Sequence, residues 1–175
     1  MGEVEARPFL EAGEEYLREE KWPQAEEAFR QAVAVYPESA VAQSKLGVAL
    51  ARQGRLEEAI SAFRQAVQLN PHYAAAYSNL GNVYREQGRV EEALRAYQQA
   101  VEADPDYWIA HQNLGGLYKE LGRFSEAVGE FKKATRLSVR DPRGGRRGCF
   151  GPTAAALIGL LLAFAGVLPA LAGLR

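Results

Sequence analysis

Cysteine and histidine are scarce in this chain of 175 residues, which contains one Cys and two His. A single Cys excludes an internal disulfide framework and a cysteine-rich zinc site, and two His leave few ligands for another metal centre. A surplus of positive charge is also lacking, since 21 Lys and Arg stand against 22 Asp and Glu. Nucleic-acid-binding domains normally carry such a surplus. The composition therefore predicts neither a bound metal nor a nucleic-acid partner.

Motifs of catalytic chemistry are missing as well. The sequence has no glycine-rich phosphate loop, no Ser/His/Asp set and no metal-ligand spacing. We therefore expect no catalytic residues, no cofactor and no enzyme activity. A secretory signal is also missing, because the first residues include no basic region followed by an apolar run. We expect the N-terminal part to stay on the cytoplasmic side of any membrane.

A period of 34 residues organises the sequence from residue 6 to residue 141. Small residues allow two helices to approach closely, an aromatic ring fills the space between them, and a closing proline ends a helix. Columns of such residues recur in all four units, and prolines close three of them. The columns are Gly13, Gly47, Gly81 and Gly115; Ala25, Ala59, Ala93 and Ala127; Phe29, Phe63, Tyr97 and Phe131; Ala32, Ala66, Ala100 and Ala134; and Pro37, Pro71 and Pro105.

Each unit is interpreted as a helix, a tight turn and a second helix, so that the predicted fold is all-α. Gly54, Gly88 and Gly122 mark the turns, because Gly readily ends a helix. His111, one period after Tyr77, is interpreted as a packing residue rather than a ligand. We place the units at 6–39, 40–73, 74–107 and 108–141, with first helices near 7–18, 41–52, 75–86 and 109–120 and second helices near 22–34, 56–69, 90–103 and 124–137.

These residues resemble the tetratricopeptide repeat (TPR). The stretch Tyr77-Ser78-Asn79-Leu80-Gly81-Asn82-Val83-Tyr84, followed by Ala93, Tyr97, Ala100 and Pro105, is close to the consensus of that family. The resemblance implies a right-handed α-solenoid of four helix-turn-helix units, with a concave groove that holds extended peptides. Unit 1 departs most from the consensus, with Ala12 for the usual Leu and Glu20 for the turn Gly, as is typical of a terminal unit.

By the same resemblance, the groove is lined by fixed positions of the first helices. The Lys/Asn/Asn/Lys/Arg clamp with which co-chaperones of the family grip a C-terminal carboxylate is not present in either register. Asn79 and Asn113 are equivalent in successive units, which is similar to the asparagine ladder of the O-GlcNAc transferase repeats, although only two rungs are present. An Asn side chain can donate to and accept from a peptide backbone. The candidate partner-binding residues are Lys45, Arg52, Ser78, Asn79, Asn82, Arg85, Gln112, Asn113 and Lys119.

The composition changes abruptly after Pro142. Residues 142–153 form a basic linker, and residues 154–174 include no charged or polar side chain. As a helix this segment extends about 31 Å, against a hydrocarbon core of about 30 Å. We therefore predict a single transmembrane helix at 154–174. The alternatives are a helix that caps the solenoid, which should have a polar outer face, and a re-entrant hairpin broken at Pro169.

Arginines precede this segment in larger number than they follow it, so the positive-inside rule places the TPR domain in the cytoplasm, as in a single-pass, tail-anchored protein. The composition favours a bacterial inner membrane, with a eukaryotic tail-anchored protein as the alternative. A stripe of small residues favours close packing of two such helices and hence a homodimer, although a segment so rich in Ala and Gly contains a stripe by composition alone. The stripe is Gly159, Ala163, Gly166, Ala170 and Gly173.

The sequence thus predicts a non-catalytic, membrane-anchored scaffold that binds a peptide or partner protein in the concave groove. A structural subunit of a larger membrane complex is the first alternative. A membrane-tethered enzyme accessory is the second, and the missing catalytic motifs disfavour it.

Overall fold

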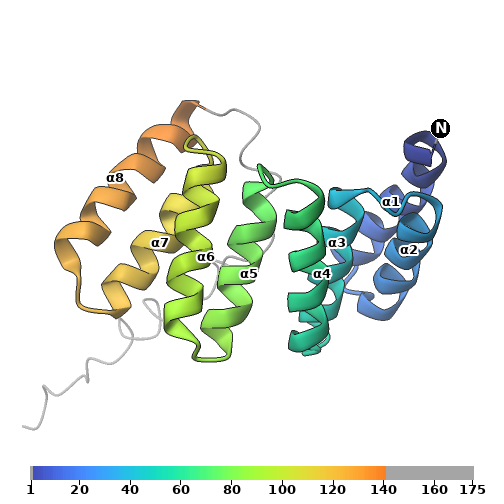
Figure 1. The fold of residues 1–175 in the computed structure, drawn as a ribbon, viewed down its shortest axis with the longest axis horizontal. Coiled ribbons are helices and arrows are strands. Elements are labelled where there is room, and N and C mark those ends of the chain that lie inside the picture. Colours follow the sequence, from blue (N-terminus) through green and yellow to red (C-terminus); the bar gives the residue numbers. More distant parts are fainter. Residues whose placement is uncertain (1, 141–175) are drawn as a thin grey trace, which may run out of the picture.

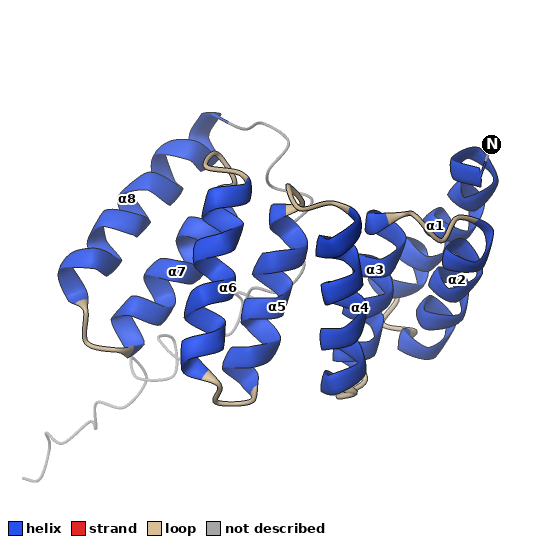
Figure 2. Ribbon diagram, viewed as in Figure 1, coloured by secondary structure: helices blue, strands red, loops and turns tan. Residues whose placement is uncertain are grey.

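The computed structural model describes residues 2–140, in which eight helices follow one another and no strand occurs (Figure 2). The predicted all-α fold of four helical hairpins is confirmed. The first helices of the units are α1 (Gly2–Arg18), α3 (Ala40–Arg52), α5 (Ala74–Glu86) and α7 (Trp108–Glu120), and the second helices are α2 (Trp22–Val35), α4 (Leu56–Leu69), α6 (Val90–Ala103) and α8 (Phe124–Arg140).

The hairpins stack in chain order from α1 at one end to α8 at the other (Figure 1). The second helix of each unit packs against the first helix of the next, as α2 does on α3, α4 on α5 and α6 on α7. Successive first helices also touch, since α3 contacts α5 and α5 contacts α7. Successive first helices are therefore closer together than successive second helices. This difference places the first helices on the inner, concave side of a curved stack, where a groove forms.

Two helix boundaries differ from the prediction by more than one residue. Helix α1 begins at Gly2 rather than near residue 7, because Ala6 is fully buried in a cluster with Ala32 and Ala42. This packing extends the helix on the N-terminal side of Pro8, where the sequence pattern indicates a helix start. Helix α8 continues to Arg140 rather than ending near residue 137, where Leu137 is still buried.

Within each hairpin, a glycine of the first helix faces an aromatic ring of the second. A Cβ atom added at Gly81 would lie 2.4 Å from Cε1 of Tyr97, which is far inside any tolerated contact. The rings of Phe29, Phe63 and Tyr97 are at most 1% exposed. The predicted pairing of small and aromatic columns is therefore the packing of the core.

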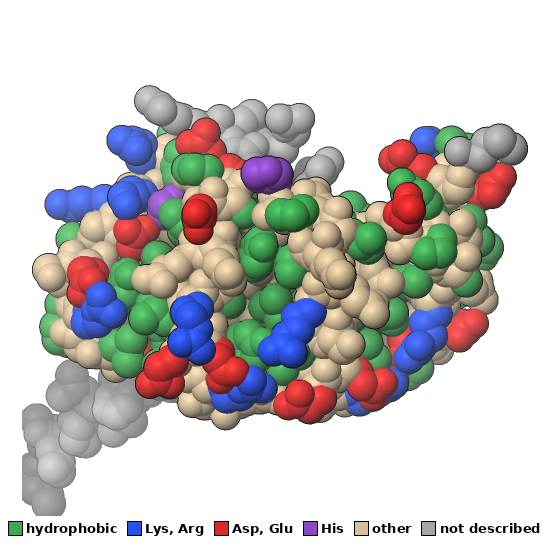
Figure 3. Space-filling model, viewed as in Figure 1, with side chains coloured by type: hydrophobic (Ala, Val, Ile, Leu, Met, Phe, Trp, Pro, Cys, Tyr) green, Lys and Arg blue, Asp and Glu red, His purple; other side chains and the backbone are tan. Residues whose placement is uncertain are grey.

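The turn inside each hairpin has the same backbone conformation throughout. Gly54, Gly88 and Gly122 have φ between +73° and +76°, and Glu20 has φ +59° at the same place in unit 1. An arginine after each of these glycines pairs with a glutamate on the following helix, as Arg89 does with Glu92. In Figure 3, cations and acids alternate along the lower edge, where Figure 1 has these turns. Exposed pairs of this kind contribute little to stability.

The predicted linker at 142–153, the transmembrane helix at 154–174 and its small-residue stripe lie outside the described residues. Among the helices at 2–140, none combines the length and the apolar character that a bilayer crossing requires.

Candidate functional site

The nine predicted groove residues all lie on three first helices. Lys45 and Arg52 belong to α3, whereas Ser78, Asn79, Asn82 and Arg85 belong to α5, and Gln112, Asn113 and Lys119 belong to α7. Because these helices touch on the inner side of the stack, residues of neighbouring units come together there.

Asn113 and Ser78 join α7 to α5. The amide nitrogen of Asn113 donates a hydrogen bond of 2.9 Å to Oγ of Ser78. Ser78 is only 2% exposed, so its hydroxyl serves the wall of the groove and does not reach a ligand. The sequence pattern predicts that Ser78 lines the groove, but in the structure Ser78 is buried beneath the groove surface.

Asn79 and Asn82 line a narrow slot between α3 and α5. The slot has about 20 Å³ of free volume, room for a methyl group or one water molecule. Ala51, Phe63 and Val83 form its apolar walls, and Glu86 also lines it. The side chain of Asn79 has no hydrogen-bond partner within residues 2–140. Its amide is therefore available to a molecule in the groove.

Asn82 is held from behind by the core. The hydroxyl of Tyr97 donates a 2.7 Å hydrogen bond to Oδ1 of Asn82. Burial raises the pKa of Tyr97 to about 12, so the hydroxyl remains a donor at neutral pH. This contact was not predicted from the sequence, yet a signal for it exists, because Tyr97 is the one polar member of a column that otherwise holds Phe.

Three of the four groove cations, Lys45, Arg85 and Arg52, contact groups from adjacent units. Nζ of Lys45 lies 3.0 Å from a carboxylate oxygen of Glu14, and Nη1 of Arg85 lies 3.8 Å from one of Glu120. The guanidinium of Arg52 lies over the ring of Trp22, 5.4 Å from its centroid. None of these three cations stands alone, which does not favour a site for a free carboxylate. Gln112 and Lys119 are exposed at the α7 end.

His111 is buried, as its interpretation as a packing residue requires, but its two nitrogens have specific partners. Nδ1 lies 2.5 Å from Oε2 of Glu130 and Nε2 lies 2.9 Å from the carbonyl oxygen of Pro105. Burial disfavours the charged form of Glu130, but hydrogen bonds from Lys133 and His111 outweigh it and hold the pKa of that carboxyl below its ordinary value. No cluster of His, Cys, Asp or Glu in the described part of the chain is arranged to bind a metal.

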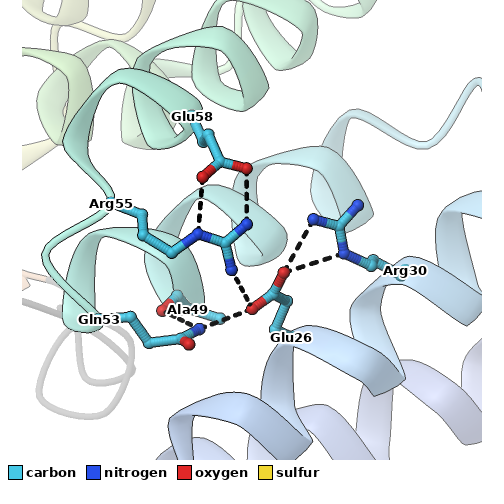
Figure 4. Close-up of polar contacts among 6 residues, drawn as sticks. All are labelled: Glu26, Arg30, Ala49, Gln53, Arg55 and Glu58. Carbon is cyan, nitrogen blue, oxygen red and sulfur yellow. Dashed lines mark hydrogen bonds and ion pairs between the residues drawn. The ribbon is translucent and has the colours of Figure 1, made fainter.

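A second polar cluster surrounds Glu26, at the junction of units 1 and 2 (Figure 4). One carboxylate oxygen accepts from Gln53 at 2.8 Å and from Arg55 at 2.7 Å, and the other accepts from Arg30. Burial opposes ionisation of Glu26, but these bonds lower its pKa overall. Both oxygens are occupied, so the cluster joins two units and leaves no group for a ligand.

Comparisons with known proteins agree with this architecture. Two family models, both described as tetratricopeptide repeat, match residues 38–106 and 78–142. No curated protein matches the sequence.

Among solved structures, that of MamA is 32% identical over 77% of this chain and 79% of that chain, with a TM-score of 0.66. PilF of Pseudomonas aeruginosa is 28% identical over 81% of this chain and 65% of that chain, with a TM-score of 0.72. The first TPR domain of Spaghetti (RPAP3), bound to the HSP90 peptide SRMEEVD, is 25% identical over 69% of this chain and 95% of that chain, with a TM-score of 0.63.

Proposed function

The chain belongs to the tetratricopeptide repeat family, whose members are generally protein-interaction scaffolds, and from this premise we propose that it holds an extended peptide segment of a partner protein in its groove at a membrane surface. TPR domains are typically non-catalytic, and the proposed role is binding alone.

The slot between α3 and α5 is the observation that carries the proposal. It combines apolar walls with the unengaged amide of Asn79, and Asn82 is oriented beside it. A backbone amide of an extended peptide offers one donor and one acceptor, which an Asn side chain can satisfy together. A small apolar side chain of the same peptide fits the slot. Recognition of this kind is tolerant of sequence, since the backbone is the same in every peptide.

The mode differs from capture of a terminal carboxylate. The RPAP3 domain is bound to a peptide in its solved structure, which supports peptide binding by a stack of this shape. In this chain, however, Lys45 and Arg85 face acids of neighbouring units. We therefore propose contacts to the peptide backbone through Asn79, with Asn113 one unit further on as the second contact.

The membrane part of the proposal rests on residues 154–174. This segment is uncharged and long enough to cross a bilayer once, and arginines precede it. It would hold the groove on the cytoplasmic face of a bacterial inner membrane, where tethering raises its effective concentration toward membrane partners. The small-residue stripe from Gly159 to Gly173 would then pair two copies.

The groove is tested with a phage-displayed library of random peptides. Selected peptides should bind the wild-type protein, and Asn79→Ala should weaken their binding about tenfold, the loss expected for one or two hydrogen bonds. Gln99→Ala, an exposed amide on α6, is the matched control and should leave binding unchanged. Equal affinities for wild type and Asn79→Ala would place the peptide elsewhere.

The anchor is tested separately by fractionating cells that express the full chain or residues 1–142. The full chain should resist extraction by alkaline carbonate, whereas the shorter chain should not sediment with membranes. Release of the full chain by carbonate would contradict a transmembrane segment and leave the groove proposal unaffected.

A further inference from the structure

The outer surface of α8 is an apolar face without a described neighbour. Phe124 is 64% exposed and Val128 is 52% exposed. Beside them lies a hollow whose walls are Val128, Phe131, Lys132, Thr135 and Arg136. We call Phe124, Val128, Lys132 and Arg136, with this hollow, the α8 end face. In Figure 3, hydrophobic side chains lie over this end of the molecule, with basic and acidic side chains beside them.

Two residues of the end face, Phe124 and Val128, stand at positions that are covered in the preceding unit. One period earlier, Val90 and Leu94 occupy the positions of Phe124 and Val128, and both pack into the main core. They do so because α7 covers α6. No helix within residues 2–140 covers α8 in the same way. The residues of α8 therefore retain the pattern of a covered helix.

The opposite end of the stack is built differently. Helix α1 has Ala12 and Glu15 where α3 has Leu46 and Ala49, which are buried. Glu15 is exposed and pairs with Arg18. Terminal repeats that face water have a polar outer side of this kind. The outer side of α1 is thus suited to contact with water, whereas the outer side of α8 is suited to contact with another apolar surface.

The charges around the α8 end face indicate what kind of surface binds there. Lys132 and Arg136 border the apolar residues, while the two acids of α8 are engaged elsewhere, Glu126 with Arg123 and Glu130 with His111. A second copy of α8 would bring like charges together, and α1 of a second copy would bring Glu15 against the apolar centre. Exposed aromatic and aliphatic side chains flanked by cations are instead suited to the interface of an anionic bilayer.

The position of the face in the chain agrees with this assignment. Helix α8 ends at Arg140, and 13 residues separate it from Ala154, where the proposed transmembrane helix begins. Fully extended, this linker reaches about 45 Å, so the end face stays close to the bilayer. We propose that the α8 end face docks onto the anionic lipid surface of the membrane in which the chain is anchored. This inference rests on the anchor proposed above.

The experiment uses the full chain in lipid nanodiscs with Cys149→Ser, so that a single new cysteine can be labelled with a maleimide. Val128→Cys reports on the end face, and Val4→Cys, at an exposed valine of α1, is the matched control. Discs contain phosphatidylcholine alone or with phosphatidylglycerol. The label should react at least about tenfold more slowly at position 128 in the anionic discs. A docking equilibrium constant of about 10 produces this difference, because only the undocked protein reacts. Position 4 should react equally in both.

Two further substitutions separate the contributions to docking. Phe124→Ser removes the apolar contact without changing charge, and Lys132→Glu with Arg136→Glu reverses the charge. Each should restore rapid labelling at position 128 in anionic discs. Circular dichroism of each variant checks that the helices remain folded.

If something other than anionic lipid contacts the α8 end face, or if nothing does, the labelling results differ. Each of these results would overturn the proposal. Slow labelling in every lipid and at every dilution means that the chain covers its own end face. Slow labelling that depends on the number of copies per disc means that a second copy covers it. Equal rates in both lipids, with the protein retained in the discs after a carbonate wash, refute the docking alone. Loss of the protein from the discs refutes the anchor and the docking with it.

Discussion

Tyr97 and Asn82 connect the hydrophobic core of unit 3 to the groove through one hydrogen bond of 2.7 Å. In the other three units the aromatic residue is Phe, and the position of Asn82 holds Glu14, Val48 or Gly116. The single Tyr of one column and the single Asn of the other thus occur in the same unit, and their side chains meet. A groove residue is thereby positioned by a side chain that no ligand in the groove can touch.

Replacing Tyr97 by Phe should lower the free energy of unfolding by about 1 kcal/mol, the net value of one buried hydrogen bond. The ring itself fits, because Phe occupies this column in the other units. Urea denaturation of Tyr97→Phe, Asn82→Ala and the double variant checks the prediction. The double variant should cost less than the sum of the two single variants, since they remove the same bond. Strict additivity would mean that the bond contributes nothing.

Gly115 and Gly116 are adjacent on α7 but should respond in opposite directions to alanine. A Cβ atom at Gly115 would lie 2.9 Å from the ring of Phe131, whereas at Gly116 the nearest atom is Nη1 of Arg85 at 3.8 Å. Gly115→Ala should destabilise the protein by about 1–3 kcal/mol through overpacking. Gly116→Ala should stabilise it by up to about 1 kcal/mol through helix propensity. Thermal melts of the two variants test this prediction. Shifts of the melting temperature in the same direction would contradict it.

Glu26 joins units 1 and 2, and its removal should be felt across that junction. Glu26→Ala leaves Gln53, Arg55 and Arg30 without their shared acceptor, and we expect a loss of about 1–2 kcal/mol in urea denaturation. Glu27→Ala is the control, because Glu27 is exposed and its one partner among residues 2–140 is Gln31 of the same helix. A surface pair of this kind is worth a few tenths of a kcal/mol. Equal losses of unfolding free energy for the two variants would show that the Glu26 cluster does not stabilise the contact between units 1 and 2.

The lowered pKa of Glu130 predicts a loss of stability in acid. A carboxyl with a lower pKa in the folded state stabilises the fold fully above its unfolded pKa, about 4.3. That contribution disappears as pH falls from there through the folded value. The free energy of unfolding should therefore fall below about pH 5, and less steeply in Glu130→Gln, which cannot titrate. Urea denaturation between pH 3 and about pH 7 measures both slopes. Identical slopes would mean that Glu130 titrates alike in the folded and unfolded chain.

Much of the fold was predictable because its core depends on columns of residues that repeat every 34 positions. The Gly81 and Tyr97 pairing is local to one hairpin, and the spacing alone indicates it. Contacts between units were harder to predict, since they depend on how far one hairpin is rotated against the next. Ser78 shows the difference, because its sequence position predicts a lining residue, but α7 covers it and Asn113 occupies its hydroxyl. The partners of Glu26 were missed for the same reason. His111 and Glu130 lie in one hairpin, and their pairing was missed because neither residue recurs in the other units.

Glu20 is the clearest place where the chain departs from its own pattern at a cost. It has φ +59°, where the other three units have glycine at φ +73° to +76°. A left-handed conformation costs a residue with a Cβ atom about 1 kcal/mol or more, and glycine avoids that cost. Glycine also gains freedom in the unfolded chain, which offsets part of the benefit. Glu20→Gly should therefore stabilise the protein by about 0.5 kcal/mol, measured by urea denaturation. Gly88→Ala is the reverse experiment, because no atom of the described residues lies within 4 Å of the added Cβ and only the backbone conformation is tested. It should destabilise the protein by about 1 kcal/mol. A destabilised Glu20→Gly would mean that the glutamate side chain contributes more than the backbone conformation costs.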